Sequence, residues 1–109
     1  MAAKTQVVFV TVNNQATVKK ITQAVLTSRL VACVSEIKNV RATYHWKGKI
    51  EKACESLLIM KTRTSLVTKL IEMIKSKHPY EVPEIIALEI KKGNREYLNW
   101  IEKETAEKK

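Results

Sequence analysis

The sequence predicts an α+β protein with the element order strand, helix, strand, strand, helix, strand, followed by a further helix near the C-terminus. Apolar residues recur at helical spacing in three segments, and runs typical of strands lie between them. The only two prolines and the only two glycines fall at the borders of these segments, where the chain must turn. This element order is that of the ferredoxin-like sandwich, a four-stranded sheet with two helices packed on it.

The first strand is expected at residues 4–12, "KTQVVFVTV", because this run is rich in β-branched residues and shows no helical stripe. Asn13 and Asn14 follow it, and asparagine is a favoured residue at a helix N-cap. Apolar residues then recur at helical spacing and predict an amphipathic helix over residues 15–29. Three residues form its apolar stripe: Val18, Ile21 and Val25.

Residues 29–62 are expected to form two long strands joined by a turn at Lys47 and Gly48. Four residues alternate along the outgoing strand and so share one face: Val40, Ala42, Tyr44 and Trp46. Strands of this length extend beyond a small sheet. Their exposed aromatic face would suit a contact between subunits better than contact with water.

A second helix is expected to begin at Thr64 or Ser65, either of which can cap it, and to end near His78. Pro79 enforces that end, because proline disfavours helical geometry in the residue before it. Residues 84–90, "EIIALEI", predict a further buried strand, and Gly93 with Asn94 predicts a turn. The last helix carries four apolar or aromatic residues before a charged tail: Tyr97, Leu98, Trp100 and Ile101.

Length and composition favour a single domain over residues 1–109, with a core that needs no cofactor to fold. No apolar run approaches the roughly 20 residues that span a bilayer, so no membrane segment is expected. Cys33 and Cys54 lack metal-binding spacing, and their neighbours predict two buried thiols in a cytoplasmic protein. The net charge of +9 favours polyanions, but the cations are scattered along the sequence, which is typical of a solvated surface.

The stretch "HPYEVPEI", residues 78–85, concentrates the groups that could bind a metal ion. His78 and Glu81 lie three residues apart in a proline-fixed turn and could hold a divalent cation such as Cu or Zn. A third ligand could come from His45, from Cys33 or from another subunit. In the alternative interpretation, His78 ends the helix, and Glu81 and Glu84 pair with lysines.

Enzymatic and nucleic-acid functions find little support in the sequence. Cys33 and His78 could in principle form a nucleophile–base pair, but the apolar segment "LVACV" favours a packed, inert thiol. Two glycines cannot build a phosphate-binding or dinucleotide-binding loop. The segment "KGKIEKACE" begins like an RNA-binding motif of this fold, but Lys49 and Ile50 stand where aromatic residues are wanted. We therefore expect a protein that is not an enzyme and does not bind nucleic acid.

Five segments together resemble the CutA family, the divalent-cation tolerance proteins, in order and in spacing. They are "RLVACV", "YHWKGKIE", "ESLLIMKT", "HPYEVPEIIAL" and "GNREYLNWI", and the resemblance extends from Val7 to Ile101. It implies a non-enzymatic homotrimer built by edge pairing of the long strands, with a PII-like architecture that binds small effectors in clefts between subunits. It also implies a part in tolerance of copper and other divalent cations.

The resemblance also implies where a ligand would bind. Some bacterial members offer a cysteine at the end of the first strand and a tandem histidine before "PY", where this chain has Val10 and Lys77, so that only His78 remains of that ligand set. The expected metal ligands are His78 and Glu81, with Cys33 as a further candidate. Seven residues are expected around the ligand cleft: Tyr44, Trp46, Lys49, Glu55, Lys61, Tyr80 and Glu84. The alternative function is a trimeric scaffold that docks a protein partner, with metal binding incidental.

Overall fold

The computed structural model describes residues 3–105 and confirms the predicted α+β element order. The elements are β1 (Thr5–Val12), α1 (Gln15–Thr27), β2 (Cys33–Trp46), β3 (Lys49–Arg63), the short 3₁₀ helix η1 (Thr64–Leu66), α2 (Val67–Lys77), β4 (Ile85–Glu89) and α3 (Arg95–Glu104).

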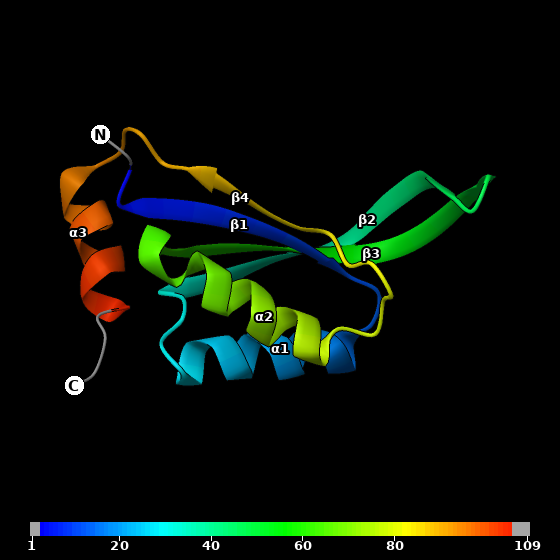
Figure 1. Ribbon diagram of the computed structural model, residues 1–109, viewed down its shortest axis with the longest axis horizontal. Coiled ribbons are helices and arrows are strands. Elements are labelled where there is room, and N and C mark those ends of the chain that lie inside the picture. The colour runs from blue at the N-terminus through cyan, green and yellow to red at the C-terminus, as the bar shows by residue number, and fades with distance from the viewer. Residues whose placement is uncertain (1–2, 106–109) are drawn as a thin grey trace.

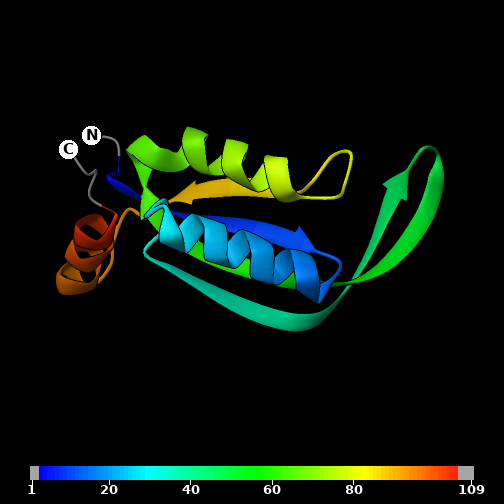
Figure 2. The same cartoon turned by 90° about the horizontal axis from the view of Figure 1, so that it is seen from below.

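The sheet has four strands in the order β2-β3-β1-β4, and every neighbouring pair is antiparallel. Figure 1 and Figure 2 show α1 and α2 packed side by side on one face of this sheet. The third helix, α3, lies at the end of the molecule away from the tip of the β2–β3 hairpin. The architecture is therefore the predicted ferredoxin-like sandwich with an additional C-terminal helix.

The core lies between the sheet and the two helices on it. Alternate residues of the central strands point into it, as the period of a strand requires. On the helix side, the predicted stripe of α1 is buried, as are Leu70 and Ile74 of α2. Five strand residues contribute to the core and are at most 1% exposed: Val8, Val10, Val12, Leu58 and Met60. Their neighbours at odd positions in β1 and β3 therefore face away from the helices.

The predicted N-cap is found at the start of α1 but not at the start of α2. Asn14 caps α1, since its side-chain oxygen accepts a 2.8 Å hydrogen bond from the Thr17 backbone N–H. Capping of the second helix by Thr64 or Ser65 was a wrong prediction, because both residues lie within η1, and neither η1 nor α2 has a side-chain cap. The Thr64 hydroxyl instead donates to the Ala3 carbonyl at 2.6 Å, and a contact so distant in sequence leaves no local signal.

The β2–β3 hairpin extends well beyond the rest of the sheet, as predicted. Strand β1 ends opposite Ser56, so the more distant residues of β3 pair with β2 alone. We call residues 38–54 the hairpin arm (Figure 2). Lys47 and Gly48 form its turn with φ values of 51° and 78°, and two consecutive residues with positive φ are what a tight type I′ turn requires.

The arm begins at an irregularity in β2. The pairing register shifts between Ile37 and Val40, and Asn39 within that interval has a φ of 63°. Asparagine tolerates this left-handed conformation better than most residues. Such a bulge bends a strand and increases its local twist. In this chain the bulge lies at the point where the arm extends beyond the four-stranded part of the sheet.

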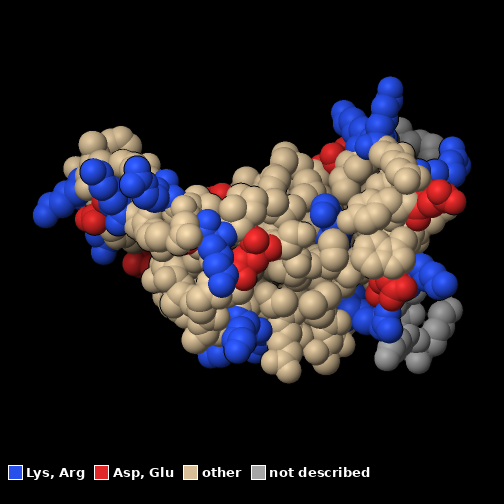
Figure 3. Space-filling view, turned by 180° about the vertical axis from the view of Figure 1, so that it is seen from behind, with Lys and Arg blue, Asp and Glu red and all other residues tan. Residues whose placement is uncertain are grey.

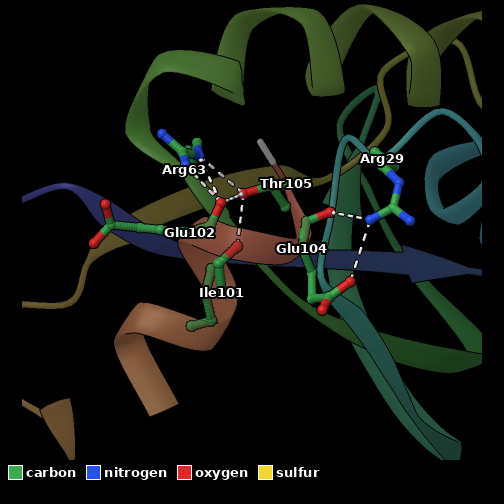
Figure 4. Close-up of polar contacts among 6 residues, drawn as sticks. All are labelled: Arg29, Arg63, Ile101, Glu102, Glu104 and Thr105. Carbon is green, nitrogen blue, oxygen red and sulfur yellow. Dashed lines mark hydrogen bonds and ion pairs between the residues drawn. The ribbon is translucent and has the colours of Figure 1, made fainter. Parts of the chain in front are cut away.

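Two arginines from outside α3 hold its C-terminal end (Figure 4). Arg63 donates from Nε to the Glu102 carbonyl oxygen at 3.1 Å and to the Thr105 hydroxyl at 3.2 Å. Arg29 donates to the Glu104 carbonyl at 3.0 Å and forms an ion pair with its carboxylate at 3.2 Å. The last carbonyls of a helix have no partners within it, and guanidinium groups supply both donors and a favourable charge.

Candidate functional site

The sheet face away from α1 and α2 carries an apolar surface that the two helices leave open. The register places Phe9 between Ile59 and Ile86, and Val7 beside Leu88, so these side chains share one face. We call the following residues the open sheet face: Val7, Phe9, Ile37, Leu57, Ile59, Ile86 and Leu88. Ile37, Ile86 and Leu88 are 50–52% exposed, which is unusual for large apolar residues gathered on one surface.

Three of the predicted site residues meet where the α2–β4 loop approaches the base of the hairpin arm. The Tyr80 hydroxyl donates a 2.6 Å hydrogen bond to the Glu55 carboxylate, and both residues are at least half-buried. The His78 ring lies against Tyr80, with 4.7 Å between the ring centroids. Glu55 comes from β3, so this contact ties the proline-fixed loop to the strand from which the arm extends.

Both ring nitrogens of His78 are engaged within the chain. Nδ1 lies 3.2 Å from the Tyr80 backbone N–H and can only accept from it. Nε2 therefore carries the proton and donates to the Thr11 carbonyl oxygen at 2.7 Å. Because a metal ion needs a free imidazole lone pair, a cation could bind His78 only by displacing the Tyr80 N–H or reversing the tautomer.

The two glutamates of the proline-fixed stretch take no part in the hydrogen bonds of the His78 ring. Glu81 and Glu84 are exposed in and after the proline-fixed turn. Within residues 3–105, no three His, Cys or Glu side chains lie close enough together to hold a metal ion. The pairing of His78 with Glu81 as metal ligands thus stays a prediction, and it requires ligands beyond those that one chain gathers.

A second cluster forms where α3 meets the strand ends. The thiol of Cys33 lies 3.7 Å from the Tyr97 hydroxyl and 3.9 Å from the Lys61 ammonium. Lys61 also lies 5.9 Å from the centroid of the Tyr97 ring, which stacks on Trp100 at 5.5 Å. Burial, followed by the hydrogen bond with Cys33, raises the pKa of the Tyr97 phenol. Sequence analysis placed Cys33 and Lys61 near a site but assigned Tyr97 and Trp100 only to an apolar stripe.

The two thiols do not behave as predicted. Cys33 is half-buried, and Cys54 is exposed on the hairpin arm, so the expectation of two buried thiols is wrong. Cys54 has an apolar neighbour on one side only, and the arm carries it beyond the core. Cys33 and His78 belong to separate hydrogen-bond networks, and the structure therefore shows no nucleophile–base pair between them.

The remaining predicted residues lie on the hairpin arm. Tyr44 and Trp46 share one face of β2 and are 41% and 37% exposed. Lys49 pairs directly with Trp46 across the turn. The aromatic pair thus lies on the projecting arm without a covering layer among residues 3–105.

A third polar network, which sequence analysis missed, links α1 to the edge of the sheet. The Glu36 carboxylate accepts hydrogen bonds from the Gln15 amide at 2.8 Å and from the Ser56 hydroxyl at 2.7 Å. These two bonds, Gln15's first, lower the pKa of Glu36. The residues are 20 or more positions apart in sequence, so only the paired strands reveal the network.

The half-buried Tyr80 phenol and its hydrogen bond to Glu55 make the stability of the fold depend on pH in the alkaline range. Burial, followed by the hydrogen bond to Glu55, raises the pKa of the Tyr80 phenol above its ordinary value of 10.0. The unfolded chain therefore loses this proton at lower pH than the folded chain does, and stability should fall as pH rises above about 10. Tyr80→Phe should make this fall less steep, as measured by denaturant unfolding at a series of alkaline pH values. An unchanged slope would contradict the assignment.

The chain matches the family model described as CutA1 divalent ion tolerance protein over residues 6–104. Protein CutA of Mus musculus is 47% identical over 97 residues, which cover 89% of this chain and 55% of that protein. Protein CutA 1, chloroplastic, of Oryza sativa subsp. japonica is 44% identical over 101 residues, covering 93% of this chain and 57% of that protein. The chain thus spans little more than half the length of these curated relatives.

Solved structures share the fold over nearly the whole chain. CutA1 from Oryza sativa superposes with a TM-score of 0.91 at 41% identity and covers 98% of both chains. A structure described as the periplasmic divalent cation tolerance protein CutA from Archaeoglobus fulgidus superposes with a TM-score of 0.89 at 30% identity. That match covers 93% of this chain and 98% of the other.

The names of these proteins correct the predicted location. The sequence predicted a cytoplasmic protein, but the rice relative is named chloroplastic and the Archaeoglobus fulgidus protein is described as periplasmic. The lack of metal-binding cysteine spacing says little about location, because relatives in this family are named for different compartments. Among residues 3–105 no helix is long and apolar enough to span a membrane.

Proposed function

Because the chain belongs to the CutA1 divalent ion tolerance family, we propose that it acts as a homotrimer whose clefts between subunits bind a ligand. The ligand is a divalent cation, with Cu or Zn as candidates, or a small molecule. The trimer performs no reaction of its own. The protein then responds to the metal through binding in the clefts and not through a catalysed reaction.

The observation that carries this proposal is the open sheet face next to a free strand edge. Ile86 and Leu88 are half-exposed on that face, and β2 is an edge strand of 14 residues. Unpaired edges and contiguous apolar surface favour association with another chain. A closed ring of identical copies covers such surfaces on every subunit, whereas an open array would continue to grow.

The cleft is the place where donors from different copies could meet. One chain engages both His78 nitrogens and leaves Glu81 exposed, so a cation would need ligands from more than one copy. The residues that we assign to the cleft are His78, Tyr80, Glu81, Glu84, Cys33, Tyr44, Trp46, Lys49, Glu55 and Lys61. Lys49 and Lys61 would pair with an anionic group of a small ligand, and the aromatic pair would pack against it.

Calorimetric titration of the metal-free protein with Cu²⁺ and Zn²⁺ tests the ligand assignment. Glu81→Gln removes a carboxylate that is exposed, so the fold should tolerate it, and we expect about tenfold weaker binding if the carboxylate is a ligand. Glu89→Gln is the matched control, since it removes an exposed carboxylate from the end of β4. If Glu81→Gln and Glu89→Gln bind the metal equally tightly, Glu81 is not a ligand. If His78→Ala binds the metal as tightly as the wild type does, His78 is not a ligand.

The second candidate is a trimeric scaffold that docks a protein partner, with metal binding incidental. The double hydrogen bonding of His78 specifically favours it, because the ring is then a structural element and needs no metal. Capture of a specific partner that survives addition of a chelator would support the scaffold. Loss of that partner on chelation would support the cation-binding function instead.

A further inference from the structure

The hairpin arm contains a hollow that belongs to neither of the clusters described above. Its volume is about 390 Å³, which lies within the range of small-molecule sites. It is lined by six residues from the two strands of the arm: Arg41, Ala42, Thr43, Lys52, Ala53 and Cys54.

The pairing register sets the chemistry of this hollow. Arg41 lies opposite Cys54, and Thr43 lies opposite Lys52, two positions further along the same face of the ribbon. A guanidinium, an ammonium, a hydroxyl and a thiol thus converge on one surface. Glu51, the only carboxylate of the arm, pairs with Tyr44 on the opposite face.

The two cations of the hollow have no anionic partner among the residues that the structure describes. In residues 3–105 the only ion pair joins Arg29 and Glu104, and both Arg41 and Lys52 are exposed. The arm has five Lys or Arg residues against that one Glu, so its 17 residues supply +4 of the +9 formal charge of the whole chain. Figure 3 shows Lys and Arg side chains gathered over the projecting arm, with few acidic atoms among them.

From this juxtaposition of Arg41, Thr43 and Lys52 we propose that the hollow binds a phosphate group of a small phosphorylated molecule. A phosphate monoester carries close to two negative charges at neutral pH, which matches one guanidinium and one ammonium. Arginine presents a planar fork that bonds two phosphate oxygens at once, lysine supplies a point charge, and the threonine hydroxyl donates to a further oxygen. A carboxylate would leave one of the two cations unmatched.

The exposed thiol of Cys54 provides a direct reporter, because it lines the hollow. In a Cys33→Ala background it is the only thiol of the chain, and iodoacetamide is a neutral reagent whose approach does not depend on charge. Alkylation of Cys54 is followed by mass spectrometry, with pyrophosphate as the probe and sodium chloride at matched sodium concentration as the reference. We expect pyrophosphate to slow the alkylation and chloride to leave its rate unchanged.

Variants of the arm separate the hollow from general attraction of anions. Arg41→Gln and Lys52→Gln should each weaken pyrophosphate binding by about tenfold or more in calorimetry, as expected for loss of a charge-assisted contact. Lys47→Gln is the matched control, since it removes an equal charge from the turn of the arm outside the hollow. Circular dichroism of each variant verifies that the arm substitutions leave the fold intact.

Each remaining outcome decides against the proposal. Equal weakening by Lys47→Gln would show attraction to the net charge of the arm and no site. Protection by a single-stranded oligonucleotide but not by pyrophosphate would assign the surface to a nucleic acid. If Cys54 of the folded protein resists alkylation without any anion, another copy covers the hollow and the proposal fails.

Discussion

Leu88→Glu is expected to reduce the proposed trimer to single chains. The side chain lies on β4 in the open sheet face and is 52% exposed in one copy, so the glutamate is harmless to an isolated chain. Covering it with another copy would bury an unpaired carboxylate, which costs several kcal/mol. Sedimentation equilibrium should change from the mass of three chains to the 12.5 kDa of one chain.

Leu26→Glu is the matched control for this experiment. Leu26 is also a large apolar residue with 41% exposure, but it lies on α1, on the other side of the sheet. This variant should keep the mass of the wild-type protein. A wild-type mass of one chain would reject the trimer itself, and an unchanged mass in Leu88→Glu would show that the open sheet face is not the interface.

Leu58→Ala is expected to lower the free energy of unfolding by about 2 to 5 kcal/mol, the usual cost of leaving a cavity in a packed core. Leu58 is completely buried in the middle of β3, between β1 and β2. Because small domains are stable by only about 5 to 15 kcal/mol, this loss would be a large share of the total. Urea unfolding at one fixed protein concentration measures it and avoids a contribution from changed assembly.

Val82→Ala should by contrast stay within about 0.5 kcal/mol of the wild type, as exposed substitutions usually do. Val82 is 68% exposed in the proline-fixed turn. A loss from Leu58→Ala as small as that of Val82→Ala would mean that the core is not packed as the strand register indicates.

The parts of the fold that sequence analysis predicted correctly depend on local patterns. The spacing of Val18, Ile21 and Val25 identified the buried side of α1, and all three are at most 4% exposed. Pro79 correctly placed the end of α2, because its effect on the preceding residue is steric and immediate. Lys47 and Gly48 marked the turn, since few dipeptides suit two residues of positive φ.

The details of the candidate site depend on contacts that no local pattern reports. His78 donates to the carbonyl of Thr11, which lies 67 positions earlier in the chain, and this bond engages the second nitrogen of the ring. Sequence spacing alone suggested His78 as a free metal ligand. Spacing reports which residues are near in sequence, but it does not report hydrogen-bond partners from other strands. Cys54 was likewise expected inside, but β1 has 8 residues against the 15 of β3, so β1 ends before Cys54 is reached and only β2 pairs with β3 there.

The arginines that hold α3 differ in how they respond to dissolved electrolyte. Arg29 holds Glu104 partly through an ion pair whose side chains are 47% and 38% exposed, and mobile ions screen such a pair. Arg63 bonds only to uncharged oxygens, the Glu102 carbonyl and the Thr105 hydroxyl, and its partners lose little by screening. As ionic strength rises, Arg29 is therefore expected to lose part of its ion pair but to keep its hydrogen bond to the Glu104 carbonyl oxygen, while both bonds of Arg63 persist. We therefore expect α3 to depend more on its bonds to neutral oxygens than on the Glu104 carboxylate in concentrated salt.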